Sequence, residues 1–457
     1  LFDKLFSTDG SYREVPWMVE SFEFSGPLMC TFKLKEGITF TDGTPFNAAA
    51  LKYQLEWILD KKNGAWSKAW LAPLKSMEIT DEHTIRFYFS EPWGSFLGIL
   101  ASVPGYAMSP ASLKADILLK ETKKASSRAK TARKKAKKAL KKAKKAEAGG
   151  GEKAKKALKK AKQAEKKAAK AEKKALALKN QVKGLKNSDV NPVGTSAYML
   201  EKHRPGTYTR VKRNPNWWFG KSVGYPDMPY FDGQLITVIP DASIQMANFR
   251  AGKLDSLYVE KSHYQQLVDD PKSEITVNKL NWSMGLRFNH ARAPFKDIRV
   301  RKAISHAIDR HALVAGIEFG LATVSSSFFP DDHWAHNPFL KPVKYDLELS
   351  KKLLAEAGYA DGLTIKGHMY MTPSLVNLTD ALRGMLKKAG IDWKVDNISP
   401  AASSDRVKNL EYDLAQNIYF YMFEPDLCVT NFYHPDGGWN FGRTNNKRVI
   451  ELIEEGR

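Results

Sequence analysis

The stretch that decides the fold reads Phe32-Lys-Leu-Lys-Glu-Gly-Ile-Thr-Phe-Thr-Asp-Gly-Thr-Pro-Phe-Asn-Ala48. Residues 31–35 alternate between polar and apolar side chains, which is the pattern of a half-buried strand. Gly37, which follows a glutamate, predicts a turn into a second strand over residues 38–41, and Gly43, which follows an aspartate, predicts the next turn. This part of the stretch therefore predicts sheet structure.

A helix is expected directly after these turns. Asn47 is a favourable N-cap residue, and it precedes a run whose apolar side chains recur at helical spacing. The expected apolar face consists of Ala49, Tyr53, Leu55, Ile58 and Leu59. A further alternating strand is predicted over residues 84–89. Strands and helices in this order predict a mixed α/β protein with helices on one side of a sheet.

The composition limits the class of protein. The chain has 457 residues, of which 43% are hydrophobic and 11% aromatic, and two cysteines. This length predicts two to four domains, and the apolar content excludes wholesale disorder. Two cysteines exclude a disulfide scaffold, and we expect both as buried free thiols. The longest apolar stretch, residues 96–103, is well short of the roughly 20 residues of a membrane helix, so we expect a soluble protein.

The positive charge is confined to one segment. The formal net charge is +22, which suggests an anionic partner only if the charge is spread over a folded face. Residues 114–186 contain 29 Lys and Arg but only six Asp and Glu, a net charge of +23. The remainder has 43 basic and 44 acidic residues. The protein is therefore a nearly neutral body with one intensely basic insert.

The insert has the pattern of an antiparallel helical hairpin. Alanine recurs with alternating spacings of four and three residues from Ala125 to Ala146, and the stripe resumes from Ala154 to Leu185. Three glycines, residues 149–151, separate the two stripes, and no helix interior favours such a run. Each arm of about 34 residues would extend for about 50 Å. Because an alanine seam buries about one methyl group per contact, its stability is expected to be marginal.

The basic charge of this hairpin has two interpretations. Charge runs are usually solvated, which favours a helical spacer or a dimerising coiled coil. The alternative is an arm that binds polyanions, although no aromatic side chains are present to stack on bases. In that interpretation the binding residues would be Lys134, Lys138, Lys141, Lys145, Lys155 and Lys159.

Several blocks in order resemble one family. The stretch over residues 32–48 resembles the signature of the family 5 extracytoplasmic solute-binding proteins, the receptors of peptide, opine and nickel ABC importers. Further segments of this chain resemble other blocks of the same family. They are residues 191–198, 213–218, 293–304, 307–310, 345–346, 354–359 and 386–391. The resemblance covers nearly all of the chain except the insert.

The resemblance implies a fold and a domain organisation. It implies a type II periplasmic-binding-protein-like fold of two α/β lobes that close on a ligand, with an extra subdomain and, here, the coiled-coil hairpin. By analogy, lobe I consists of residues 1–16 and 192–280, and its extra subdomain consists of residues 17–113 and 187–191. The hairpin consists of residues 114–186, and lobe II consists of residues 281–457. We expect the chain to be a fragment or a processed form, because it stops before the segments that return to lobe I.

The ligand site is expected to be aromatic. Peptide-binding relatives hold the peptide amine with an Asp shortly before an acidic residue and Pro, and here that position falls on Tyr421 or Met422. No Arg for a carboxylate occurs between Met369 and Asp380, although Arg406 could hold an anionic group. The remaining candidates are Trp282, Tyr419, Trp439 and Asn440, which suit apolar or sugar-like faces, or a long peptide held by its backbone. For Trp282 and Tyr419, a plain core position is an equal alternative.

No enzyme, metal site or cofactor is predicted. His306 and His311 form only a weak pair, and no serine, histidine and acid form a nucleophile motif. The expected function is that of an extracytoplasmic receptor that presents a peptide or other polar organic solute to a membrane permease. It would be periplasmic or extracytoplasmic, associated with the membrane through its transporter, and monomeric unless the hairpin dimerises. The alternative is an envelope interaction protein whose hairpin binds anionic polymers or nucleic acid.

Overall fold

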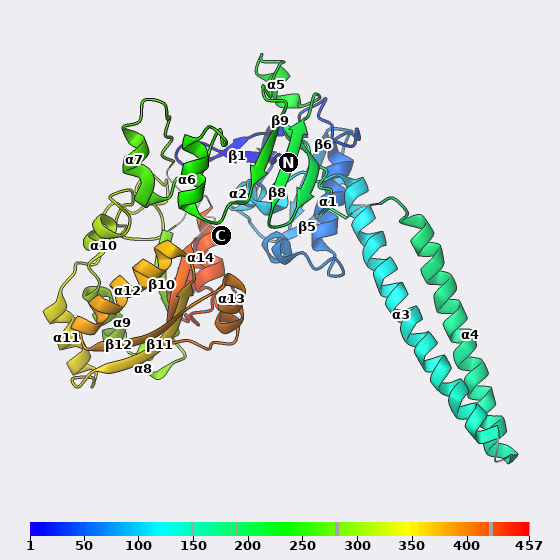
Figure 1. Cartoon of the computed structure of the whole chain (residues 1–457). Coiled ribbons are helices and arrows are strands. Elements are labelled where there is room, and N and C mark those ends of the chain that lie inside the picture. The colour runs from blue at the N-terminus through cyan, green and yellow to red at the C-terminus, as the bar shows by residue number, and fades with distance from the viewer. Residues whose placement is uncertain (148–149, 186, 189, 279–282, 420–423, 457) are drawn as a thin grey trace. The chain divides into compact units, whose positions relative to one another are not determined.

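The computed structural model describes residues 1–147, 150–185, 187–188, 190–278, 283–419 and 424–456 (Figure 1). The chain divides into two compact units. Unit 1 contains residues 1–5, 16–91 and 103–238, and unit 2 contains residues 6–15, 92–102 and 239–457. The lobe boundaries expected from the resemblance stay a prediction.

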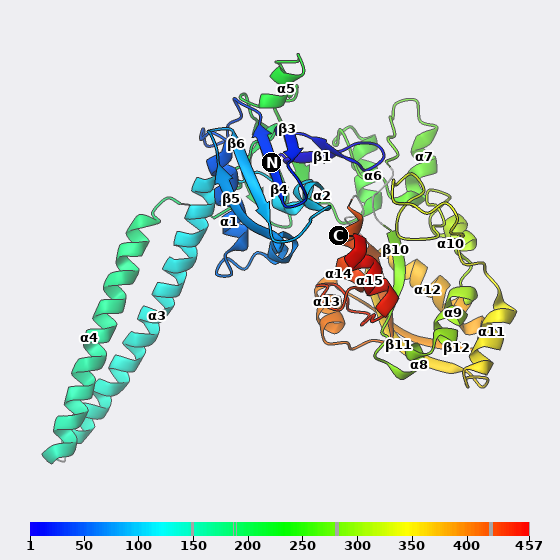
Figure 2. The same cartoon turned by 180° about the vertical axis from the view of Figure 1, so that it is seen from behind.

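Unit 1 contains a four-stranded antiparallel sheet with the strand order β3-β4-β6-β5 (Figure 2). Its strands are β3 (Val19–Phe24), β4 (Met29–Leu34), β5 (Leu74–Ile79) and β6 (Thr84–Phe89). The predicted strands over residues 31–35 and 84–89 are confirmed as β4 and β6, which pair with each other. Their alternating side chains Cys30, Phe32, Ile85 and Phe87 are fully buried.

The predicted strand over residues 38–41 is wrong. Both edges of β4 are occupied, by β3 and β6, so no edge remains for a hairpin partner. Residues 38–46 form a compact loop instead, with a single bridge between Thr39 and Pro45. The Asp42 carboxylate organises this loop, because it accepts hydrogen bonds from the Thr44 amide at 3.0 Å and from the Ser109 hydroxyl at 2.5 Å. Gly37 has a φ of +75°, as the predicted turn requires.

The helix predicted after Asn47 is α1 (Ala48–Leu59). The Asn47 side chain accepts a hydrogen bond from the Ala50 amide at 3.0 Å, which confirms the predicted cap. The predicted apolar face is only partly right, because Ala49 is exposed and Gln54 is buried. The Gln54 amide is satisfied there, since it donates to the Pro104 carbonyl and accepts from the Met108 amide.

A second sheet of unit 1 has the order β7-β8-β9, all antiparallel. Its strands are β7 (Tyr198–Arg204), β8 (Tyr208–Arg213) and β9 (Gly233–Thr237), and α5 (Trp218–Ser222) lies between the last two in sequence. The Asp3 carboxylate connects this region to the start of the chain, because it accepts hydrogen bonds from the Trp218 indole at 3.0 Å and from the Thr195 hydroxyl at 3.2 Å.

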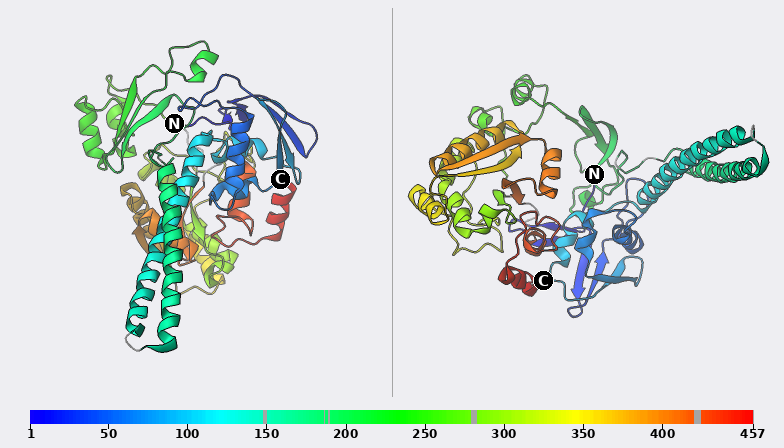
Figure 3. Two further views of the ribbon diagram at one scale, coloured as in Figure 1. Left: turned by 90° about the vertical axis from the view of Figure 1, so that its right-hand side faces the viewer. Right: turned by 90° about the horizontal axis from the view of Figure 1, so that it is seen from below.

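The basic insert forms the predicted hairpin of two long helices, α3 (Pro110–Glu147) and α4 (Gly151–Gln181). They lie side by side and antiparallel in every view (Figures 1 to 3). The first turns of α3 belong to the body of unit 1. There Lys120 donates to the Lys62 carbonyl at 2.7 Å, and Asp116 accepts from the Ser188 amide at 2.8 Å.

The alanine seam is confirmed. Its most buried members repeat every seven residues on both helices, as Ala129, Ala136 and Ala143 on α3 and as Ala161, Ala168 and Ala175 on α4. Ala125, Ala129 and Ala175 form one cluster with Ala171 and Leu178 packed against it. Arg133 of α3 and Glu172 of α4 pair across the helices at 3.7 Å. This register is what a heptad seam between antiparallel helices requires.

Unit 2 is built on a mixed sheet with the order β10-β13-β11-β12. Its strands are β10 (Ser283–Phe288), β11 (Leu363–Tyr370), β12 (Ile391–Ile398) and β13 (Leu414–Tyr419). The pairs of β11 with β12 and with β13 are parallel, and that of β10 with β13 is antiparallel. β11 and β13 approach each other closely at the centre of the sheet. Position 367 requires a glycine there, because a Cβ atom would overlap the Leu414 carbonyl oxygen.

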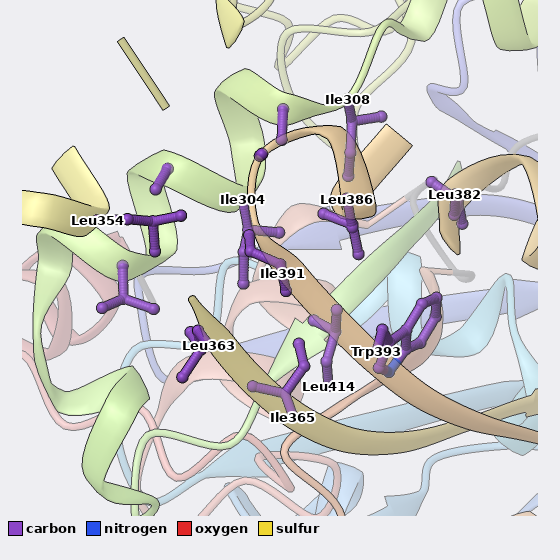
Figure 4. Packing of buried hydrophobic residues seen from close by; sticks show 14 of the residues in the cluster. Ile304, Ile308, Leu354, Leu363, Ile365, Leu382, Leu386, Ile391, Trp393 and Leu414 are labelled. Atoms are coloured by element: carbon purple, nitrogen blue, oxygen red, sulfur yellow. The ribbon is translucent and has the colours of Figure 1, made fainter. Parts of the chain in front are cut away.

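The main core of unit 2 lies between one face of this sheet and three helices (Figure 4). The helices are α9 (Ile298–Ala307), α11 (Leu347–Glu356) and α12 (Pro373–Lys388). Strand side chains such as Ile365, Ile391 and Trp393 pack there against Ile304, Leu354 and Leu386. On the strands these residues follow the period of two that places alternate side chains on one face.

The other helices of unit 2 have ten residues or fewer, and several are capped by side chains. They are α2 (Phe96–Leu100), α6 (Ala242–Arg250), α7 (Tyr264–Val268), α8 (Ala293–Lys296), α10 (Arg310–Gly316), α13 (Pro400–Lys408), α14 (Pro425–Tyr433) and α15 (Lys447–Gly456). Two short strands, β1 (Phe6–Thr8) and β2 (Glu14–Pro16), pair with each other.

The start of α14 packs tightly against α2. Glu424 caps α14 by accepting a hydrogen bond from the Leu427 amide at 2.6 Å, and only 7% of the residue is exposed. A Cβ atom at Gly98 of α2 would overlap the Glu424 side chain and would lie 2.8 Å from the Glu14 carboxylate. Burial raises the pKa of Glu424 to about 8, with further upward contributions from Asp426 and Glu14.

The two cysteines are free and buried, as predicted. Burial raises the pKa of the Cys30 thiol to about 12 and also raises that of Cys428. Within the described residues, no helix has the length and apolar content needed to cross a bilayer. Among the same residues, no three His, Cys, Asp or Glu side chains gather as a metal ion would require.

We predict that Gly367→Ala strongly destabilises unit 2. The added methyl group would overlap the Leu414 carbonyl and crowd the Trp393 indole, so we expect a loss of at least about 2 kcal/mol in the free energy of unfolding. Chemical denaturation would measure it. The control is Gly384→Ala, because Gly384 is an exposed residue of α12 with open space around its Cα. That change should stabilise by about 0.5–1 kcal/mol, and equal effects of the two substitutions would contradict the packing at Gly367.

We predict that Glu424 makes stability depend on pH. Its pKa is about 8 in the folded chain against an ordinary 4.5, so the folded state holds this proton more tightly. The stabilisation is complete below about pH 4.5 and is lost as the pH rises through 8. Glu424→Gln keeps the cap acceptor without the charge, and it should raise the Tm at pH 8.5 but change it little at pH 4.5.

The control for this experiment is Glu348→Gln, which alters a side chain that is 84% exposed. It should leave the pH dependence of the Tm unchanged. An effect of Glu424→Gln that has the same size at both pH values would contradict the raised pKa of Glu424.

Candidate functional site

The site is assembled around Tyr419, the last residue of β13. Its ring stacks on Phe328 with centroids 5.2 Å apart and an interplanar angle of 19°. It also contacts Phe432 of α14 at 4.9 Å. Tyr419 and Phe328 are half-buried, so parts of both rings remain accessible. The end of β13, the loop that contains Phe328 and the helix α14 therefore meet at the stacked rings of Tyr419 and Phe328.

Tyr433, also on α14, adds the second hydroxyl group. Its hydroxyl donates to the Tyr419 hydroxyl at 3.1 Å, and its ring stacks on Phe328 at 5.8 Å. Burial raises the pKa of Tyr433, and the neighbouring Tyr419 raises it further. The Tyr433 phenol is therefore neutral at physiological pH, and its hydroxyl acts as a hydrogen-bond donor rather than as a charge.

Trp439 joins the same group from the loop after α14. Its ring lies 5.4 Å from that of Phe432, and its amide donates to the Asn431 carbonyl at 3.0 Å. A Cβ atom at Gly437 would overlap the Thr430 and Asn431 carbonyls, so a glycine is needed for the loop to return to the helix. We call the set of Phe328, Phe329, Tyr419, Phe432, Tyr433 and Trp439 the aromatic cluster.

Three further rings continue from Phe329. His333 lies 4.7 Å from Phe329 and stacks on Trp334 at 5.7 Å and on Tyr12 at 5.2 Å. Trp334 is 47% exposed, whereas His333 is buried. These contacts connect the rings of Phe329, His333, Trp334 and Tyr12 in a continuous series. Some ring faces in the series are buried and others are accessible to solvent. Such faces provide apolar contact area with a few polar tips, which is the composition of small-molecule sites.

Asn440 and Arg406 have partners within the protein. The Asn440 amide nitrogen donates to the His434 and Thr444 carbonyls, and its oxygen accepts from the Thr444 amide, so it organises its own loop. Arg406 of α13 donates to Asp396 of β12 at 2.7 Å. An anionic ligand would therefore compete with a carboxylate for Arg406. Burial, together with Arg406 and Arg287, lowers the pKa of the neighbouring His368 to about 4, so this histidine is neutral.

The sequence candidates divide into three groups. Tyr419 and Trp439 lie together in the aromatic cluster, and each contacts Phe432. Asn440 follows Trp439, and Arg406 lies on α13. Trp282, Tyr421 and Met422 lie outside the described residues. Whether any of the seven binds a ligand stays a prediction.

The sequence interpretation missed Phe328, Tyr433 and His333. The adjacent phenylalanines at 328–329 and the Tyr433-His434 pair, six residues before Trp439, were the available signals. Phe328 and His333 come from a loop that is distant in sequence from Tyr419, and Tyr433 comes from the helix that follows β13, so only the folded chain shows that they meet.

The predicted lysines of the hairpin are all exposed. Lys134, Lys138 and Lys141 line one hollow of about 560 Å³, which we call the α3 hollow. Its other lining residues are Ala129, Lys130, Arg133, Lys137 and Glu172. Lys145, Lys155 and Lys159 do not line it.

Comparison with known proteins identifies the family. The model of bacterial extracellular solute-binding proteins, family 5, matches residues 13–440. Heme-binding protein A of Haemophilus influenzae is 26% identical over 283 residues, which cover 58% of this chain and 49% of that protein. Glutathione-binding protein GsiB of Escherichia coli O1:K1 / APEC is 24% identical over 365 residues, which cover 79% and 57%. The chain thus spans about half the length of these curated relatives.

Solved structures show the same fold. NikZ from Campylobacter jejuni in complex with Ni(L-His) superimposes with a TM-score of 0.73 and 21% identity, over 99% of this chain and 80% of that one. DppA from Helicobacter pylori in complex with the peptide STSA gives 0.73 and 20%, over 100% and 80%. These likenesses confirm the two-lobed periplasmic-binding-protein-like fold expected from the resemblance. The family match covers well over half of the chain, and the chain therefore belongs to the bacterial extracellular solute-binding proteins of family 5.

Proposed function

We propose that this protein is the extracytoplasmic receptor of an ABC importer and that the aromatic cluster contributes to its solute site. The family membership supports the receptor role, since the family consists of binding proteins of transporters rather than enzymes. Closure around a bound solute would be the signal that a membrane permease reads, and the association with the membrane would occur through that transporter.

The solute class follows from the chemistry of the cluster. The relatives include proteins named for heme and glutathione, and the similar structures hold Ni(L-His) and a peptide, so the fold itself does not select a ligand. Here the two hydroxyls of the cluster form a hydrogen bond with each other, and Arg406 is already paired with Asp396. We therefore propose a peptide held by its backbone, or another polar organic solute with flat or apolar faces.

A second candidate function concerns the hairpin. We propose that it contacts anionic polymers, which could be polymers of the cell envelope or nucleic acid. The observation that favours this function is the α3 hollow, in which basic side chains outnumber acidic ones by six to one. The hairpin would then hold the receptor near a polyanion, and solute binding would be a separate activity of the body.

We predict that removal of cluster side chains weakens solute binding. Trp439→Ala should lower the affinity for the bound solute about tenfold or more, because an indole supplies a large apolar contact. Tyr419→Phe should cause a smaller loss, since it removes only the hydroxyl that accepts from Tyr433. The matched control is Phe339→Ala, because Phe339 is 89% exposed and lies outside the cluster.

The measurement is native mass spectrometry of solute that co-purifies with the chain, followed by thermal shift with that solute. Probe ligands are a mixture of nine-residue peptides, glutathione, and Ni²⁺ with L-histidine. The Tm should rise with at least one probe or with the co-purified solute. No co-purified solute and no shift with any probe would contradict the receptor function, whereas equal loss in Trp439→Ala and Phe339→Ala would contradict only the assigned site.

A further inference from the structure

We propose that the α3 hollow is a binding site for a single linear polymer with a phosphate backbone. This inference rests on the second candidate function. It specifies where on the hairpin the polymer binds and which class of polymer binds there. The hollow has a volume of about 560 Å³ and is lined by five lysines, Arg133, Ala129 and Glu172. Ala129 belongs to the seam, and Glu172 is the lining residue that α4 contributes.

The charges that line the hollow are mostly uncompensated. Glu172 is the one acid in its lining, and Arg133 pairs with it at 3.7 Å. None of the five lysines forms an ion pair with an acid among the residues that the structure describes. These five cations lie within three turns of one helix, so they repel one another. A bound polyanion would remove that repulsion and release its own counterions.

The sequence of α3 sets this region apart from α4. No acid occurs between Glu121 and Glu147, a stretch of 25 residues with 13 basic side chains. In contrast, α4 carries Glu152, Glu165 and Glu172 among its lysines. Both helices present lysines opposite the seam, and five of the α3 lysines line the α3 hollow. The same number of lysines can therefore be replaced on either helix for comparison.

The spacing of the α3 lysines fits a chain of regularly repeated charges. Lys130, Lys134, Lys137 and Lys141 follow one another at intervals of four, three and four residues, which is about one helical turn or about 5.4 Å each. An extended phosphate-backbone chain can place successive charges along such a row. A compact anion could contact only one or two of these lysines at once.

The hairpin lacks the features that would select nucleobases or a bilayer. Residues 114–186 contain no Phe, Trp, Tyr or His, so base stacking can add nothing. The strongly exposed apolar side chains on the two helices are Leu158 and Leu176, which are far apart on α4 and form no apolar stripe for insertion into lipid. Binding should therefore depend on the number of phosphates and not on the bases.

The test uses the full chain and two variants that lose equal charge. The α3 variant carries Lys→Gln at positions 130, 134, 137, 138 and 141, and the α4 variant carries Lys→Gln at positions 159, 162, 166, 170 and 173. Glutamine keeps helix propensity, and circular dichroism would confirm equal helicity. The probes are fluorescent oligo-dT of fifteen nucleotides and inorganic polyphosphate of matched charge, titrated between 50 and 200 mM salt.

The α3 variant should bind both probes at least tenfold more weakly, and its slope of log affinity against log salt should flatten by about 3. The α4 variant should keep most of the affinity and slope of the parent. Equal losses in the two variants would overturn the site but not polyanion binding by the hairpin. Binding would then depend on the total charge of the hairpin and not on the α3 lysines in particular. No binding by the parent chain would overturn both.

Two further outcomes identify the source of the polymer. Similar affinities for the two probes support a phosphate-backbone ligand, and a strong preference for oligo-dT would contradict it. Competition by vesicles of phosphatidylglycerol that exceeds competition by polyphosphate would likewise overturn the proposal in favour of a membrane surface. Thermal shift by the solute should be the same in both variants, so failure of the receptor function is detected separately.

Discussion

The close approach of β11 and β13 at Gly367 is the contact on which unit 2 depends. No side chain fits there, because a Cβ atom would occupy the position of the Leu414 carbonyl. This contact places β13 between β10 and β11, and so fixes a sheet with parallel and antiparallel pairs. The sheet can then bury one face against α9, α11 and α12 and direct the end of β13 toward α14. Tyr419 occupies its place in the aromatic cluster as a consequence.

Local patterns predicted local structure well. The alternation in β4 and β6, the cap at Asn47 and the heptad seam of the hairpin each depend on neighbouring residues, and each is present. The strand expected over residues 38–41 is absent. Its alternation is compatible with a strand, but β4 has no free edge with which it could pair. One edge of β4 pairs with β3, which precedes it directly in the chain, and the other edge pairs with β6, which is distant in sequence. Pairing of this kind is decided by competition between segments, which a single stretch does not reveal.

The candidate site was predicted only in part for a related reason. Tyr419 and Trp439 could be selected from their residue type and from the resemblance, but Phe328 and Tyr433 could not, because three separate segments form the cluster. Arg406 was expected to be able to hold an anionic group, and the folded chain pairs it with Asp396, so that role stays a prediction. In the proposed site, selectivity would then come from shape and from two phenol hydroxyls.

The heptad register of the hairpin has a consequence for its length. The buried alanines repeat every seven residues on both arms. Removing or inserting one heptad in each arm would leave every other contact of the seam, and the root of α3 beside Lys62, unchanged. The hairpin is thus a modular element whose reach can change in steps of about 10 Å without any compensating change in the body that carries it.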